Sequence, residues 1–225
     1  MDIPIAQRSR RLPIYILADR SGSMAGDAIV AVNQGLRFLK SDLEIEPRAV
    51  QSVWISVISF GGVARVDVPL TELMGYIPPT LDADGSTPLG EALRLLNRSI
   101  DNDVVFGGGK GTGDYRPMVF IFTDGKPDDE WRTAAQEVKQ RNRAKTANII
   151  AVGCGSQVNT AMLKEITETV LYMESTTGGS FQSLINWISS SVKTASVSKQ
   201  AVGETPGAPM PVQLPNLPPG ITVVL

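Results

Sequence analysis

Three small oxygen-bearing side chains alternate in a single turn near the start of the chain. Asp19, Ser21 and Ser23 stand in a glycine-containing turn that directly follows the apolar run Leu12 to Ala18. This spacing lets a carboxylate and two hydroxyls converge on one point. Hard divalent cations such as Mg²⁺ prefer oxygen ligands of this kind. We interpret the turn as the first part of a metal site, with a polar helix cap as the alternative.

Two later segments carry oxygen donors in a matching context. Thr87 stands in a glycine-flanked segment that opens a helical pattern, and Asp124 follows an apolar strand pattern. Each has an ordinary interpretation when taken alone. Thr87 precedes Pro88 and fits a helix cap, whereas Asp124 and Gly125 fit a simple turn. The agreement of three segments favours a metal site with Thr87 and Asp124 as the fourth and fifth ligands.

Strand and helix patterns alternate along the chain from residue 12 onward. Such alternation predicts a parallel sheet with right-handed crossovers. The expected fold is α/β, a doubly wound, mostly parallel sheet with helices on both faces and one antiparallel edge strand after the turn at Gly61 and Gly62. The expected strands are 12–18, 53–60, 63–70 (the edge strand), 118–123, 148–152 and 169–173, and the expected helices are 29–43, 89–100, 128–145, 160–166 and 180–197.

The predicted topology brings the candidate ligands to one edge of the sheet. In sheets of this kind, ligand sites form at the carboxyl ends of strands where the strand order reverses. Asp19 and Asp124 both follow strand ends, so we expect them at the same edge, with Thr87 approaching from a loop. We expect Asp128 and Asp129 at the start of their own helix, where the helix dipole favours negative charge. A rim that contacts solvent or a partner is expected from Arg20, Asp82, Asp84, Lys126 and Asp128.

Length and composition indicate one folded domain between two arms. A chain of 225 residues suffices for one α/β core. We expect an N-terminal arm at 1–10, the domain at 11–198 and a Pro-rich tail at 199–225, since six of the 15 prolines lie beyond residue 200. The tail ends in an apolar run. It fits a strand added to a sheet edge, its own or a partner's, and equally an arm lying over its own domain.

Several classes of function are disfavoured. The chain has no histidine, which removes Ser-His-Asp catalysis and His-ligated zinc. A net charge of −2 gives no sign of nucleic-acid binding. The single Cys154 and the strand-sized apolar runs favour a cytoplasmic protein without a membrane span. The run 107–113 is not a phosphate-binding loop, because glycine follows Lys110; we expect a surface loop there.

The three metal-site segments together resemble the von Willebrand factor A domain family over residues 10 to 195. The resemblance implies a metal-ion-dependent adhesion site that binds Mg²⁺, or Mn²⁺ or Ca²⁺ in its place. In that family the two serines and the threonine, here Ser21, Ser23 and Thr87, contact the ion, and the aspartates often act through water. The runs 11–15, 86–93 and 123–131 are further similar to the bacterial tellurium-resistance TerY-like group.

This resemblance implies a non-enzymatic, metal-dependent protein–protein interaction module that acts as an adaptor or scaffold. A partner Asp or Glu would complete the coordination of the ion. For the TerY-like group it further implies a stress or tellurite-resistance system, with a protein kinase and a PP2C-like metal-dependent phosphatase as candidate partners. Two alternatives stay open: a structural subunit whose metal only stabilises the fold, and a metal-dependent hydrolase or phosphatase using Asp19. The second lacks a carboxylate two residues later, where Ser21 stands.

Overall fold

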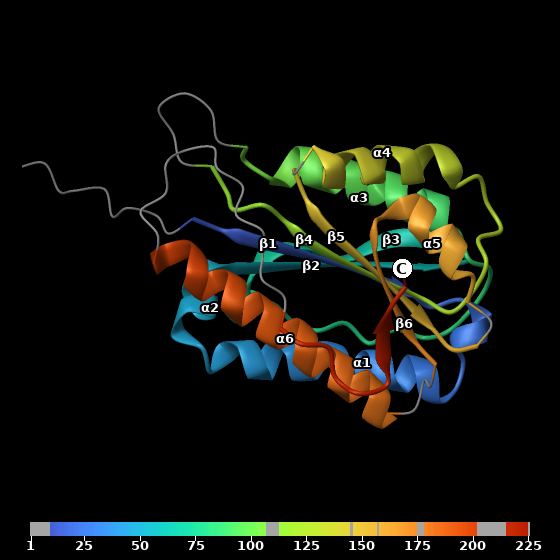
Figure 1. Cartoon of the computed structure of the whole chain (residues 1–225), viewed down its shortest axis with the longest axis horizontal. Coiled ribbons are helices and arrows are strands. Elements are labelled where there is room, and N and C mark those ends of the chain that lie inside the picture. The colour runs from blue at the N-terminus through green and yellow to red at the C-terminus, as the bar shows by residue number, and fades with distance from the viewer. Residues whose placement is uncertain are drawn as a thin grey trace, which may run out of the picture.

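The described part of the chain is built around one seven-stranded sheet. The computed structural model describes residues 10–106, 113–144, 146–156, 158–174, 178–201 and 215–224. Most of the predicted arm 1–10 and of the glycine-rich run 107–113 lies outside these ranges. The strand order is β3-β2-β1-β4-β5-β6-β7 (Figure 1). The strands are β1 (Leu12–Asp19), β2 (Val53–Gly61), β3 (Val63–Glu72), β4 (Met118–Thr123), β5 (Asn148–Cys154), β6 (Thr169–Met173) and β7 (Ile221–Val223).

The five central strands are parallel and the two edge strands are antiparallel. β3 pairs antiparallel with β2, as the sequence predicted, and β7 pairs antiparallel with β6. The mostly parallel α/β fold is therefore confirmed, with a second antiparallel edge supplied by the tail. The chain runs from β1 outward to β2 and β3 and then returns to β4 on the other side of β1. The strand order reverses between β1 and β4, which is where such sheets form ligand sites.

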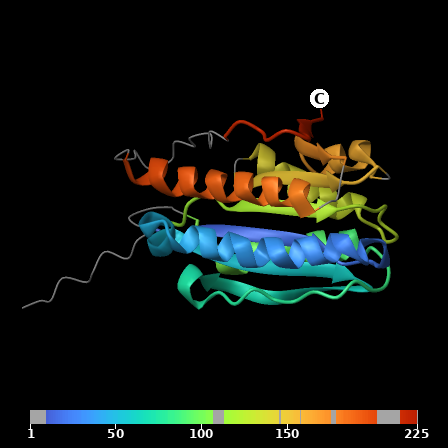
Figure 2. The same cartoon turned by 90° about the horizontal axis from the view of Figure 1, so that it is seen from below.

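Helices cover both faces of the sheet (Figures 1 and 2). The layer of α1, α2 and α6 lies on one face, and the layer of α3, α4 and α5 lies on the other. None of the described helices combines the length and apolar character needed to cross a membrane. The helices are α1 (Asp27–Glu44), α2 (Pro47–Ser52), α3 (Leu89–Asp103), α4 (Arg132–Arg143), α5 (Thr160–Ile166) and α6 (Gly178–Ala201), with short 3₁₀ turns η1 (Gly22–Met24) and η2 (Leu73–Gly75).

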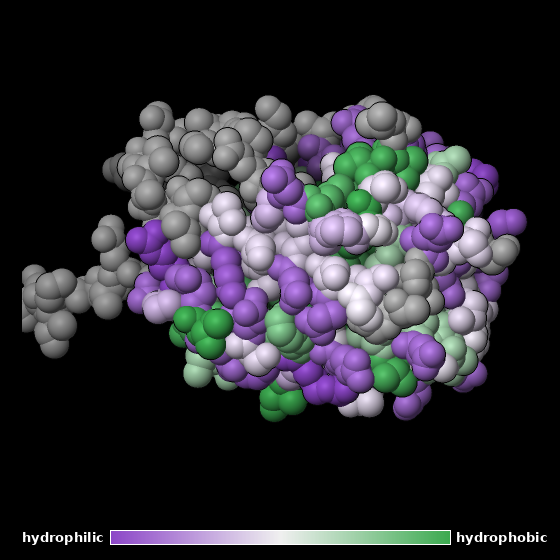
Figure 3. Space-filling model, turned by 60° about the horizontal axis from the view of Figure 1, so that its bottom comes forward, coloured by the Kyte–Doolittle hydropathy of each residue, from purple (hydrophilic) through white to green (hydrophobic). Residues whose placement is uncertain are grey.

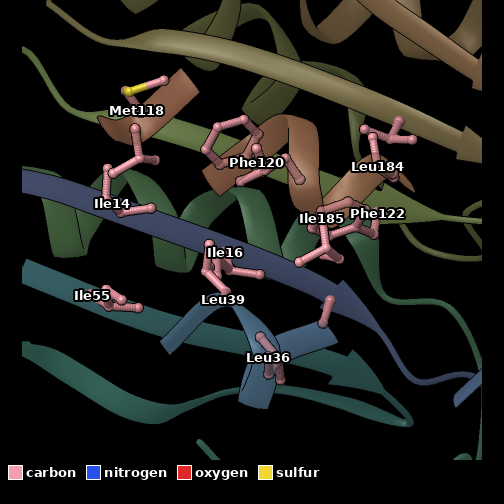
Figure 4. Packing of buried hydrophobic residues seen from close by; sticks show 14 of the residues in the cluster. Ile14, Ile16, Leu36, Leu39, Ile55, Met118, Phe120, Phe122, Leu184 and Ile185 are labelled. Atoms are coloured by element: carbon pink, nitrogen blue, oxygen red, sulfur yellow. The ribbon is translucent and has the colours of Figure 1, made fainter. Parts of the chain in front are cut away.

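Each face of the sheet has its own hydrophobic core. All eight residues of β1 are buried, as expected for a central strand covered on both sides. Because side chains alternate along a strand, Ile16 enters the core under α1 and α6, and Leu17 enters the core under α3 and α4. Figure 4 shows Ile16 packed near Leu36 and Leu39 of α1 and Ile185 of α6. This packing fixes β1, and with it the start of the candidate site.

Two helices differ from the sequence-based expectation. The short α2 was not predicted; it begins after Glu46, whose carboxylate accepts a hydrogen bond from the backbone N–H of Arg48 at 3.3 Å. The helix expected at 128–145 begins only at Arg132 and ends at Arg143. Glu130 accepts the backbone N–H of Thr133 at 3.1 Å and so helps to fix that later start.

The tail adds a strand to its own sheet. Of the alternatives that the sequence left open, the structure shows β7 on the free edge of β6 in the same chain. α6 continues to Ala201, past the predicted start of the tail at residue 199. The indole N–H of Trp187 on α6 donates a hydrogen bond to the carbonyl of Pro215 at 2.9 Å. The described part of the tail is thus tied to both α6 and β6.

Candidate metal centre

The end of β1 holds Asp19 in a defined position. The residue is fully buried, and both of its carboxylate oxygens accept hydrogen bonds. The backbone N–H of Ser21 donates to Oδ1 at 2.8 Å, and the hydroxyl of Thr123 donates to Oδ2 at 2.6 Å. Thr123 is the last residue of β4, so this contact ties the two strand ends where the strand order reverses. Thr123 was not among the predicted ligands, although it directly precedes Asp124.

The two serine hydroxyls continue this contact across the edge of the sheet. Ser21 Oγ and Ser23 Oγ lie 3.1 Å apart, and Ser23 donates a hydrogen bond to Asp124 Oδ1 at 2.8 Å. Ser21 is buried, whereas Ser23 is exposed and Asp124 is partly buried. Together with Thr123, the side chains of Asp19, Ser21, Ser23 and Asp124 thus form one connected group of five that reaches from the core to the surface.

Thr87 joins this group from the loop before α3. A side-chain Cβ at Gly125 would lie 3.4 Å from Thr87 Oγ1 and 3.7 Å from Ser23 Oγ. The two hydroxyls therefore face the same small space, which the lack of a side chain at Gly125 keeps open. Within the described residues, no hydrogen bond engages the Thr87 hydroxyl. The N-cap position of α3 is occupied by Pro88, and no side-chain hydrogen bond caps the helix there. Thr87 therefore does not serve as the helix cap.

Asp128 fixes the backbone of Thr87. The backbone N–H of Thr87 donates to Asp128 Oδ2 at 2.9 Å, and the backbone N–H of Asp128 donates to the carbonyl of Thr87 at 3.3 Å. The next residue, Asp129, accepts the backbone N–H groups of Gly90 and Glu91 at 2.9 and 2.8 Å. These aspartates were expected at the start of their own helix. Asp129 instead holds the first turn of α3, where free N–H groups and the positive end of the helix dipole attract a carboxylate, and Asp128 holds the residue that precedes the N-cap of α3.

The turn that follows β1 and the loop before α3 are joined through backbone hydrogen bonds. The carbonyl of Arg20 accepts a hydrogen bond from the backbone N–H of Asp84 at 2.8 Å, and the backbone N–H of Gly22 donates to the carbonyl of Gly85 at 2.9 Å. Gly85 has φ of +75°, and a Cβ there would meet the backbone nitrogen of Gly62 at 2.6 Å. Only glycine fits this approach without strain. The close contact explains how a loop far along the chain is held beside the serines.

The predicted rim is only partly a surface feature. Asp82, Asp84, Lys126 and Asp128 are exposed. Arg20 differs from that expectation because it is only 8% exposed. Its guanidinium donates to Ser59 Oγ at 3.3 Å and to the carbonyl of Asp82 at 3.5 Å. The guanidinium therefore packs inside the edge and leaves little surface for a partner to contact.

Two carboxylates lie close together at the site, and no described basic side chain forms an ion pair with either of them. Burial raises the pKa of Asp19, the hydrogen bonds from Ser21 and Thr123 lower it, and the charge of Asp124 raises it further; the net direction is upward. Among the described ion pairs, none involves Asp19 or Asp124. Burial, aided by both carboxylates, also raises the pKa of Cys154 at the end of β5 to about 12. A cation would relieve this accumulation of charge.

The donor set suits a hard divalent cation. Within the described residues, no group of three or more His, Cys, Asp or Glu is placed to hold a metal ion. Any ion here would therefore depend on hydroxyls as well as on the two carboxylates. All five predicted ligands lie around one edge of the sheet, and their oxygens match the preference of Mg²⁺ and Ca²⁺. The residues that could hold the ion are Asp19, Ser21, Ser23, Thr87 and Asp124.

Comparison with known proteins identifies the architecture. A family model described as von Willebrand factor type A domain matches residues 14–187. A search of the curated proteins finds no match. The matched residues include all five candidate ligands and end within α6, before β7.

Solved structures share the fold at low sequence identity. The pilus adhesin SpaC of Lactobacillus rhamnosus GG aligns over 84% of this chain and 31% of its own, with 14% identity and a TM-score of 0.66. The PilB minor pilin of Streptococcus sanguinis, as its D319A mutant, aligns over 90% and 65%, with 13% identity and a TM-score of 0.60. The proximal thread matrix protein 1 of the mussel byssus aligns over 79% and 46%, with 21% identity and a TM-score of 0.57. This chain thus spans less than half of the adhesin and of the mussel protein.

Proposed function

Because the chain belongs to the von Willebrand factor type A domain family, we propose that it is a non-enzymatic module that binds a protein partner through a divalent metal ion. Mg²⁺ is the leading candidate, with Mn²⁺ or Ca²⁺ able to replace it. The observation that carries the proposal is that Ser21, Ser23, Thr87 and Asp124 lie at the same edge of the sheet as the buried carboxylate of Asp19. The occurrence of the same fold in a pilus adhesin and a minor pilin is consistent with an adhesive role.

The binding chemistry follows from the kinds of donor. A bound Mg²⁺ supplies a positive charge with open coordination positions for outside oxygen ligands. Neutral hydroxyls from Ser21, Ser23 and Thr87 would hold the ion without cancelling its charge. The exposure of Ser23 places the group at the surface, where an Asp or Glu side chain of a partner can reach it. The geometry therefore favours recognition of an acidic residue on another protein.

We extend the proposal to the cellular setting on the TerY-like resemblance alone. The chain would act in the cytoplasm of a bacterium, as an adaptor in a stress or tellurite-resistance system. A protein kinase and a PP2C-like phosphatase are the first partners to test. An enzyme using Asp19 is less well supported, because Ser21 stands where such phosphatases need a second carboxylate.

A paired binding experiment tests the proposal. The purified chain is used as bait in a lysate of its source organism, in parallel with Mg²⁺ and with EDTA, and retained proteins are identified by mass spectrometry. We expect a partner that is retained only with Mg²⁺ and is lost in Ser21→Ala and Thr87→Ala. Ser41→Ala is the matched control, since its hydroxyl binds the carbonyl of Phe38 on α1, away from the site. Equal retention in EDTA, or in both site variants, would exclude the metal from partner binding.

A further inference from the structure

The tail segment 215–224, called here the edge segment, closes one side of the sheet. It runs past α6 and then along β6, where it forms β7 (Figure 2). The register pairs Leu171 with Val223 and Met173 with Ile221, and the backbone N–H of Val224 donates to the carbonyl of Val170 at 2.9 Å. These contacts are between backbones. The edge segment is therefore held by the same interactions that add a peptide strand to a free sheet edge.

Only one side chain of the edge segment is deeply buried. Ile221 is 5% exposed and enters the core between the sheet and α6, whereas Thr222 and Val223 face outward. Leu217 packs against the same core from a partly buried position, and Val224 packs in the same way against the core on the other face of the sheet. In contrast, every residue of the central strand β1 is buried. One deeply buried anchor beside a short backbone ladder is the pattern of a strand added at a sheet edge rather than of a core strand.

Trp187 supplies a second specific contact. Its side chain is 4% exposed, and its indole N–H donates to the carbonyl of Pro215 at 2.9 Å. A buried indole N–H needs an acceptor, and here the acceptor comes from the edge segment. Six positions separate Pro215, which accepts the hydrogen bond from Trp187, from the buried side chain of Ile221.

The edge segment lies outside the part of the chain that the family model matches. The family match ends at residue 187, so β7 lies outside it. Residues 215–224 contain no charged side chain, and the segment is held by backbone pairing, by the aliphatic side chains of Ile221, Leu217 and Val224, and by the carbonyl of Pro215. Elsewhere, the side that bears α1 and α6 is mostly hydrophilic, with apolar residues in small separate groups (Figure 3). The edge of β6 is therefore distinct from a general apolar surface.

From these contacts we infer that the edge of β6, together with Trp187 of α6, is a peptide-binding site, occupied in the same chain by the edge segment. Its ligand in another protein is an uncharged extended segment with a proline carbonyl for Trp187 and a β-branched aliphatic residue six positions later. The edge segment is then a built-in competitor. The site does not use the metal ligands, so it operates whether or not the metal-dependent function holds.

The test separates the edge segment from the chain without altering any described contact. A specific protease site is inserted between residues 202 and 214 of the full chain, the chain is cut, and a labelled peptide of residues 215–225 is added. Fluorescence anisotropy should show saturable binding that excess unlabelled peptide reverses. The uncut chain should bind at least about 100-fold more weakly, because its own segment competes at a high effective concentration.

Two variants check the contacts. A peptide with Ile221→Asp should bind at least about tenfold more weakly, since a carboxylate would enter the core without a partner. A peptide with Thr222→Ala should bind like the original, because that side chain is exposed. In the protein, Trp187→Phe should weaken binding about fivefold through loss of one hydrogen bond. EDTA should leave all of these affinities unchanged.

Several results would overturn the inference. The cut chain could unfold, or the cut segment could fail to exchange with labelled peptide, and either result would make the edge segment an integral strand. Absence of saturable binding to the cut chain, or equal binding of the Ile221→Asp peptide, would show that the edge of β6 does not recognise this chemistry. None of these results bears on the metal-dependent pull-down, so the two proposals fail separately.

Discussion

The replacement Asp19→Asn should stabilise the metal-free protein and abolish its response to Mg²⁺. Asp19 is fully buried, and burial is the main cause that raises its pKa. The ionised carboxylate is therefore less stable in the folded chain than in water. Asparagine removes the charge and keeps the shape. Its carbonyl can accept the N–H of Ser21, and its amide can donate to Thr123, whose hydroxyl can rotate.

The size of the effect follows from opposing contributions. Removing a carboxylate from water without a cationic partner costs several kcal/mol. The two hydrogen bonds to the charged oxygens offset about 1.5–3 kcal/mol each. The raised pKa indicates that desolvation wins, so we expect a net gain of about 1–2 kcal/mol for asparagine. For a chain of this size the gain corresponds to a Tm increase of about 2–8 °C.

The dependence on pH has a definite sign. A pKa that is higher in the folded than in the unfolded state means that the folded state binds the proton more tightly. The stabilisation from protonated Asp19 is complete below the ordinary aspartate pKa of about 4 and is lost as pH rises through the raised folded value. In EDTA, the difference in stability between Asp19→Asn and the original chain should therefore grow as pH rises above about 4.

Thermal unfolding in EDTA and in excess Mg²⁺ measures both effects. The original chain should gain stability with Mg²⁺, and Asp19→Asn should be more stable in EDTA and unchanged by Mg²⁺. Asp124→Asn is the matched control; it should stabilise less, because Asp124 is partly exposed. A lower Tm for Asp19→Asn in EDTA would refute the account of desolvation. A full Mg²⁺ response in that variant would remove Asp19 from the metal site.

Three further predictions concern the supports of the site. Asp128→Ala should weaken Mg²⁺ binding about tenfold in calorimetry, because it releases the backbone of Thr87. Asp128→Asn keeps an acceptor for that backbone N–H and should bind Mg²⁺ nearly as the original chain does. Equal affinities of Asp128→Ala and the original chain would show that Asp128 does not support the metal site. Gly90→Ala should destabilise by about 3 kcal/mol in urea unfolding, because its Cβ would lie 2.1 Å from the carbonyl oxygen of Glu130; an unchanged midpoint would contradict this packing. Cys154, with its pKa raised to about 12 and 2% exposure, should not react with Ellman's reagent at pH 8 until the chain is unfolded, and fast reaction of the native chain would contradict its burial.

The sheet was predictable because its signals are local. Continuous apolar runs predicted the central strands, and the paired glycines at 61 and 62 predicted the antiparallel β3. The short α2 was not predicted, because a pattern of six residues is too short to distinguish a helix from a loop. The tail was left with alternatives, since an apolar terminal run fits any free sheet edge equally well. Only the assembled sheet shows that β6 has a free edge within reach.

The candidate ligands were easier to predict than the residues that support them. Asp19 and Asp124 follow strand ends, and the topology brings strand ends together. The roles of Asp128 and Asp129 depend on contacts with a loop about forty positions earlier. The local sequence instead predicted that both aspartates lie at the start of α4, because helix starts commonly carry acidic residues. Arg20 was placed at the rim from its charge, but its long side chain turns inward to the carbonyl of Asp82.

The same contacts that assemble the site also make it unfavourable without a cation. Thr123 and Ser21 hold the buried carboxylate of Asp19 in place, and Asp124 adds a second negative charge beside it. Thr87 is held nearby through its backbone, which leaves its hydroxyl without a hydrogen bond among the described contacts. A chain selected for stability alone would carry asparagine at position 19. The proposed cation would recover this free energy, so metal affinity and fold stability should change together across all five ligand positions.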